Sequence, residues 1–132
     1  MTHAAAAVFS LIAAAAAGPQ LEVVRREGGH GVEVRCDGMA LHASPEEGLW
    51  SIGADWRDQW PAQWRHAHAS RVERPGEWTV LHGVVETPRG DWRVRDAYRP
   101  RHGLIQCIRR FEWTGEQTAA RTTLSVRFRA PG

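Results

Sequence analysis

The stretch that decides the fold is EWTVLHGVVETPRGDWRVRDAYRPRHGLIQCIRRFEW, residues 77–113. It contains three runs in which side chains of different character alternate. In the middle run Trp92, Val94 and Tyr98 share one face with Asp96, and arginines occupy the other face. The third run places a similar set on one face, namely Ile105, Cys107, Arg109, Phe111 and Trp113. A period of two in residues such as Trp, Val, Ile and Tyr predicts β-strands.

Two breaks separate these runs, TPRG at 87–90 and RPRHG at 99–103. Proline fixes φ early in a turn and glycine accepts a positive φ near its end, so both breaks predict hairpin connections. Further strands are expected over 21–26, 32–36, 39–43, 49–52, 71–73 and 118–130, with turn residues such as Asp37-Gly38 between them. The sequence therefore predicts an all-β chain, an antiparallel meander that forms a β-sandwich.

The least regular segment surrounds three tryptophans. Trp56, Trp60 and Trp64 are spaced by four residues, as on one face of a helix, but Pro61 interrupts them. We expect a loop here with at most one or two turns of helix.

Length and composition indicate one globular domain. The chain has 132 residues, of which 42% are hydrophobic, and its formal net charge is +2. Its basic residues are all arginines, which suits a GC-rich coding sequence, and acidic residues are interspersed among them. A nucleic-acid partner, which calls for a clustered basic face, is therefore not expected.

The amino terminus has the features of an export signal. Ala4–Ala17 is apolar and uncharged, is too short to span a bilayer, and ends in small residues that suit signal peptidase. Residues 1–17 are predicted to be a signal peptide and 18–132 a β-sandwich domain of a secreted or periplasmic protein. The alternative is an alanine-rich helix at the start of a cytoplasmic chain.

Two cysteines and an H-x-H pair are the residues of this chain that could form a disulfide or bind a metal. Cys36 and Cys107 are the only cysteines, and either a disulfide or two buried thiols fits an exported protein, the thiols being slightly favoured. His66 and His68 have the H-x-H spacing of metal ligands on a strand. This spacing alone is common, so histidines without a metal are the favoured interpretation, and no metal or cofactor is predicted.

Candidate binding residues come from the irregular segment. The chain has seven tryptophans, and most are interpreted as core residues. An indole that is exposed in a loop can instead stack on the C–H face of a sugar. The predicted carbohydrate-binding residues are Trp56, Trp60, Trp64, Asp55 and Asp58.

Carboxylates would matter in a hydrolase, because a glycosidase uses two across its cleft. Asp96 is the most informative, since it lies on the face expected to be buried and there requires an arginine or hydroxyl partner. A structural Asp–Arg pair is favoured over catalysis. No catalytic residue is assigned.

Four motifs carry a family resemblance: GEWTV at 76–80, GDWRVRDAY at 90–98, IRRFEW at 108–113 and TLSVRF at 123–128. They resemble the N-terminal β domain of bacterial glycoside hydrolases that have a six-hairpin (α/α)6 catalytic barrel. Those domains are large antiparallel super-sandwiches, similar to the galactose mutarotase fold, and the acid and base lie mainly on the barrel.

The resemblance implies a partial super-sandwich, incomplete at its C-terminus, that packs against a catalytic barrel absent from this chain. It implies a non-catalytic role, with carbohydrate as partner and no membrane span. Two alternatives remain at this point: a free-standing carbohydrate-binding module, and a small mutarotase-like enzyme with Asp96, His82 or Asp55 as acid or base.

Overall fold

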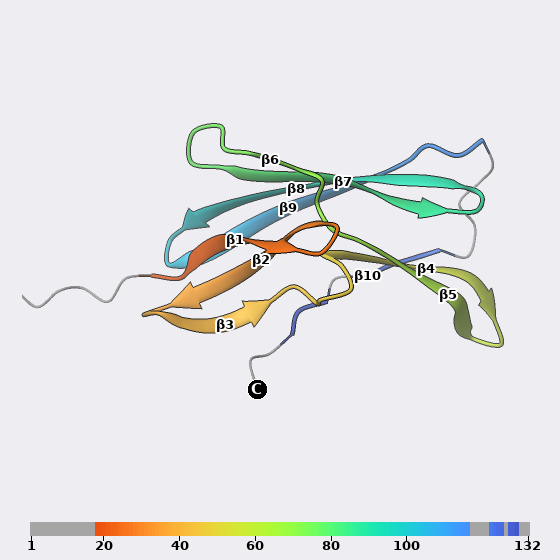
Figure 1. The fold of residues 1–132 in the computed structure, drawn as a ribbon, viewed down its shortest axis with the longest axis horizontal. Coiled ribbons are helices and arrows are strands. Elements are labelled where there is room, and N and C mark those ends of the chain that lie inside the picture. The colour runs from red at the N-terminus through yellow and green to blue at the C-terminus, as the bar shows by residue number, and fades with distance from the viewer. Residues whose placement is uncertain (1–17, 117–121, 126, 130–132) are drawn as a thin grey trace, which may run out of the picture.

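The computed structural model describes residues 18–116, 122–125 and 127–129. These residues form ten β-strands and no helix, and every pairing between the strands is antiparallel (Figure 1). The predicted all-β antiparallel fold is confirmed. The predicted signal peptide, residues 1–17, lies outside the described residues.

The strands are arranged in three sheets. The N-terminal sheet has the order β1-β2-β3, the hairpin sheet β10-β4-β5, and the meander sheet β6-β7-β8-β9. The strand bounds are β1 Gln20–Arg26, β2 Gly29–Cys36, β3 Met39–Ala43, β4 Trp50–Arg57, β5 Trp60–Ala67, β6 Arg71–Glu73, β7 Thr79–Thr87, β8 Gly90–Arg101, β9 Leu104–Trp113 and β10 Thr123–Ser125.

The meander sheet forms one layer, and the other two sheets lie side by side against it (Figure 1). β4 and β5 contact β7 across the layers, and β1 contacts β8. An isolated bridge between His30 and Ala69 ties the N-terminal sheet to the segment that follows β5. The N-terminal sheet and the hairpin sheet therefore both pack on the meander sheet.

The alternation predicted for the meander is present. Val94 pairs with Phe111, Asp96 with Arg109 and Tyr98 with Cys107, so the predicted faces coincide across β8 and β9. The first hairpin turns through residues 88 and 89, as expected. The second turns through His102 and Gly103, whose φ angles are 50° and 75°.

Pro100 had been expected to lie in that second turn, but it belongs to β8 and pairs with Ile105. β7 begins at Thr79, opposite Tyr98, so Pro100 has a partner strand on one side only. A proline that lacks an N–H is tolerated at such a position.

The expected loop or short helix around the tryptophans is wrong. Residues 50–67 form the β4–β5 hairpin, which turns through Asp58 and Gln59 with φ angles of 48° and 67°. Pro61 lies within β5, an edge strand of its sheet, where proline is tolerated. A spacing of four residues is even, so it fits one face of a strand as well as one face of a helix.

The last predicted strand is present in part. β10 covers Thr123–Ser125 and pairs with β4, so that Leu124 lies opposite Ile52. The remainder of 118–130 belongs partly to residues outside the described part of the chain.

The core lies between the layers and centres on Trp50. Trp50, Ile52, Leu81 and Val85 are fully buried. The indole of Trp50 lies directly against Gly83, where a Cβ would overlap the ring and would meet the backbone oxygen of His68 at 3.0 Å. Glycine at this position lets the largest core side chain reach the meander sheet.

Replacement of Gly83 by alanine should therefore destabilise the fold by about 1–3 kcal/mol, because the added methyl group forces Trp50 out of its position. Urea unfolding measures the change. Gly18→Ala is the matched control: the nearest heavy atom to its Cβ would lie at 3.8 Å, so its stability should stay close to wild type. Equal stability of Gly83→Ala and Gly18→Ala would contradict this account of the core.

Candidate functional site

Asp96 is the most enclosed charged group in the described chain, with 0% of its surface exposed. The guanidinium of Arg109 donates to both of its oxygens, at 2.7 and 2.5 Å. The Tyr98 hydroxyl donates at 2.7 Å and the Trp50 indole Nε1 at 3.0 Å. Four donors therefore neutralise and orient this buried carboxylate.

This environment has a structural function. Burial, together with the negative charge of Asp96, raises the pKa of Tyr98 above its ordinary value, so the phenol remains a donor. Asp96 faces the core and His82 lies on the opposite face of the meander sheet, because His82 and Leu81 are neighbours on β7 and Leu81 pairs with Asp96. Asp96 and His82, two of the three residues weighed as acid or base of a mutarotase-like enzyme, therefore do not converge.

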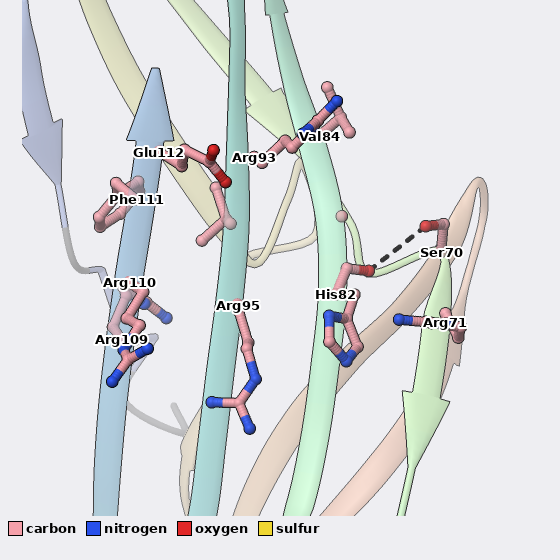
Figure 2. Close-up of a pocket in the computed structure, with 12 residues that line it drawn as sticks. Ser70, Arg71, His82, Val84, Arg93, Arg95, Arg109, Arg110, Phe111 and Glu112 are labelled. Atoms are coloured by element: carbon pink, nitrogen blue, oxygen red, sulfur yellow. Dashed lines mark hydrogen bonds between the residues drawn. The ribbon is translucent and has the colours of Figure 1, made fainter. Parts of the chain in front are cut away.

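The outward face of the meander sheet brings four basic side chains into one line. Arg71 on β6 pairs with His82 on β7, His82 with Arg95 on β8, and Arg95 with Arg110 on β9. We call these four residues the basic row. Figure 2 shows their side chains in this order across the four strands. The sheet thus places three arginines and one histidine that are far apart in sequence in a single line.

The two ends of the basic row differ in their partners. At the β6 end, Glu73 lies 3.3 Å from the Arg71 guanidinium and 3.0 Å from His82 Nε2. At the β9 end, Arg95 and Arg110 have no hydrogen-bonding or ion-pair partner within the described part of the chain. Like charges directly opposite on neighbouring strands repel each other, so this end is suited to a bound anion.

An open depression of about 840 Å³ covers the basic row. Arginines dominate its lining and Glu112 is the single carboxylate among the described lining residues. The full lining is Ser70, Arg71, His82, Gly83, Val84, Arg93, Val94, Arg95, Arg109, Arg110, Phe111 and Glu112. Arginine guanidinium groups bind carboxylates and phosphates through paired hydrogen bonds, so the surface can bind an anionic ligand.

The sequence interpretation missed this surface. It treated the arginines as dispersed among acidic residues, which is true along the chain but not across the sheet. The register that creates the basic row follows from the positions of the three turns that link β6, β7, β8 and β9, so turn placement was the signal available.

The predicted carbohydrate-binding residues cluster on the β4–β5 hairpin. Asp58 is exposed in its turn, and Trp60, the first residue of β5, is 69% exposed. Trp64 is half-buried and its ring lies against Gly53. Asp55 and Trp56 belong to β4, and their side chains lie outside the described part of the structure. Trp60 is therefore the accessible indole of the described hairpin.

The structure has no disulfide between the two cysteines. Cys36 ends β2, and its Sγ lies 3.9 Å from the Asp37 carboxylate, whereas Cys107 is in β9 of another sheet. Cys107 is exposed as a residue, but its side chain is on the face that carries Asp96. Desolvation there and the charge of Asp96 raise the pKa of Cys107 to about 11, so its thiol is a weak nucleophile.

The two histidines of the H-x-H pair have separate partners. His66 Nδ1 lies 2.9 Å from Ser51 Oγ, and His68 Nε2 lies 2.8 Å from the Glu46 backbone oxygen. Desolvation and the positive charge of Arg127 lower the pKa of His66. Residues 18–116, 122–125 and 127–129 contain no group of three or more His, Cys, Asp or Glu side chains able to hold a metal ion.

No family model, curated protein or solved structure matches this chain. Its described residues also contain no helix long and apolar enough to cross a membrane. The resemblance to glycoside hydrolase β domains therefore rests on the four sequence motifs alone.

The buried Asp96–Arg109 pair should stabilise the fold more than the exposed Glu77–Arg99 pair does. Asp96→Asn keeps the side-chain shape but leaves the buried Arg109 charge without a counterion, so unfolding should become easier by about 3–5 kcal/mol. The matched control is Glu77→Gln, which removes the exposed 2.8 Å pair with Arg99 and should cost less than about 1 kcal/mol. Similar small losses in both variants, measured by urea unfolding, would show that Asp96 has no special stabilising role.

Proposed function

We propose that this chain is a non-catalytic β-sandwich domain of a secreted carbohydrate-active enzyme and that it contacts carbohydrate through the β4–β5 hairpin. The observation that carries the proposal is Trp60, an indole 69% exposed next to the tip of that hairpin. Tryptophan is highly buried on average in folded proteins, and exposed apolar surface rimmed by polar residues marks binding sites.

The surroundings of Trp60 support this role. Trp64 lies four residues further along β5, so both side chains project from the same face of the strand. Asp58, in the adjacent turn, adds an exposed carboxylate that can accept hydrogen bonds from sugar hydroxyls. An indole with a neighbouring carboxylate provides the apolar and polar contacts that a pyranose ring needs.

A free-standing carbohydrate-binding module is the second candidate, and the same hairpin favours it. The two candidates differ in whether the domain is attached to a catalytic barrel. The mutarotase-like alternative receives less support, because Asp96 is enclosed by Trp50, Tyr98 and Arg109.

Trp60→Ala should abolish glycan binding or weaken it by about fivefold or more, since stacking of an aromatic side chain contributes on the order of 1 kcal/mol or more. A glycan array followed by calorimetry on the best glycan measures the change. Leu104→Ala is the matched control, because Leu104 is also an apolar residue just after a hairpin turn and is 70% exposed. Absence of glycan binding by the wild type, or equal loss in both variants, would overturn the carbohydrate contact.

Attachment to an enzyme is tested separately. An antibody against this chain should detect, in the exported fraction of the source cells, a polypeptide much larger than the 14.8 kDa of the chain itself. A band at or below that mass would favour the free-standing module and contradict attachment to a barrel.

A further inference from the structure

We propose that the basic row is a second binding surface, and that its ligand is an acidic polysaccharide whose sugars carry carboxylates. The surface belongs to the meander sheet and is distinct from the tryptophan hairpin. The inference rests on the proposed function in one respect only, the choice of a polysaccharide as the ligand.

The β9 end of the basic row carries positive charge without a carboxylate partner in the described chain. Arg95 and Arg110 are directly opposed on β8 and β9 and lack a carboxylate partner in the described chain. Cross-strand neighbours are separated by only about 5 Å, so the pair is destabilising without an anion. Arg93, two residues from Arg95 on the same face, lies opposite Glu112 without an ion pair between them. The uncompensated charge is therefore concentrated at one end of the depression.

The basic row runs across the strands and is one residue wide. Glu112 on one flank would repel anions placed beside it, whereas Glu73 on the other flank is already paired with Arg71 and His82. A single extended chain with regularly spaced negative charges fits this strip, whereas a wide anionic surface does not.

The flanks of the basic row carry exposed aliphatic side chains. Val84 and Ile108 are exposed next to it, at 43% and 42%, and offer aliphatic surface to the C–H face of a sugar. Trp78, which shares this face, is covered by the Arg99 guanidinium at 4.4 Å from the ring centroid. Single-stranded nucleic acids bind through accessible aromatic side chains, so this face is poorly suited to a single-stranded nucleic acid.

The test measures binding of the full chain to soluble polygalacturonate, with dextran as the neutral polymer. Wild type should bind polygalacturonate, bind dextran at least about tenfold more weakly at this surface, and lose affinity as sodium chloride rises from about 50 to 200 mM. The double variant Arg95→Gln, Arg110→Gln should weaken polygalacturonate binding by about tenfold or more.

The matched control is Arg74→Gln, Arg101→Gln, which removes the same charge from two exposed arginines outside the basic row. It should bind nearly as wild type does. The thermal midpoint of the Arg95/Arg110 variant should equal or exceed that of wild type, because a repulsive pair has been removed. A clear fall in that midpoint would show that the two arginines stabilise the fold and would overturn the proposal.

Three further results would also overturn it: no binding of polygalacturonate at low salt, equal losses in both double variants, or tighter binding of duplex DNA or a sulfated polymer. Trp60→Ala separates this proposal from the function proposed above. If Trp60→Ala loses glycan binding while Arg95→Gln, Arg110→Gln binds as wild type does, the hairpin site is supported and the basic row is excluded. If the Arg95→Gln, Arg110→Gln variant loses polygalacturonate binding while Trp60→Ala binds as wild type does, the basic row is supported and the hairpin site is excluded.

Discussion

The fold depends on how one buried carboxylate is satisfied. Asp96 has no exposed surface, and an ionised carboxylate in that environment is tolerated only with good partners. Arg109 supplies the opposite charge from the neighbouring strand, and Tyr98 supplies a hydroxyl from the same strand. Trp50 supplies the fourth donor from the hairpin sheet, so this hydrogen bond connects the hairpin sheet to the meander sheet. The geometry of the core must keep all of these donors in place.

The same sheet separates two kinds of chemistry by strand alternation. Toward the core it presents Val94, Asp96 and Tyr98, and toward solvent it presents Arg93 and Arg95. Inside, one arginine is matched to one carboxylate at close range. Outside, arginines face each other across β8 and β9 without such a match. The inner arrangement favours stability, and the outer one retains charge that stability alone does not require.

Much of the meander could be predicted from the sequence, because period-two alternation fixes which side chains share a face. The need of Asp96 for an arginine or hydroxyl partner followed from the same pattern. The Trp50 donor did not, since it lies 46 residues earlier in the chain and reaches Asp96 only through packing between layers. The β4–β5 hairpin was missed because a four-residue spacing fits both a helix and a strand, and the basic row because it depends on register across three strand pairings.

Pro61 has a consequence for association between molecules. It lies in β5, an edge strand of the hairpin sheet, and its nitrogen carries no hydrogen that an incoming strand could use. An edge with an interrupted series of donors is a poor template for intermolecular strand pairing. The β4–β5 hairpin carries an exposed indole next to this edge, a combination that favours self-association. Pro61 therefore disfavours the addition of strands from other molecules, which is the step by which fibrils grow.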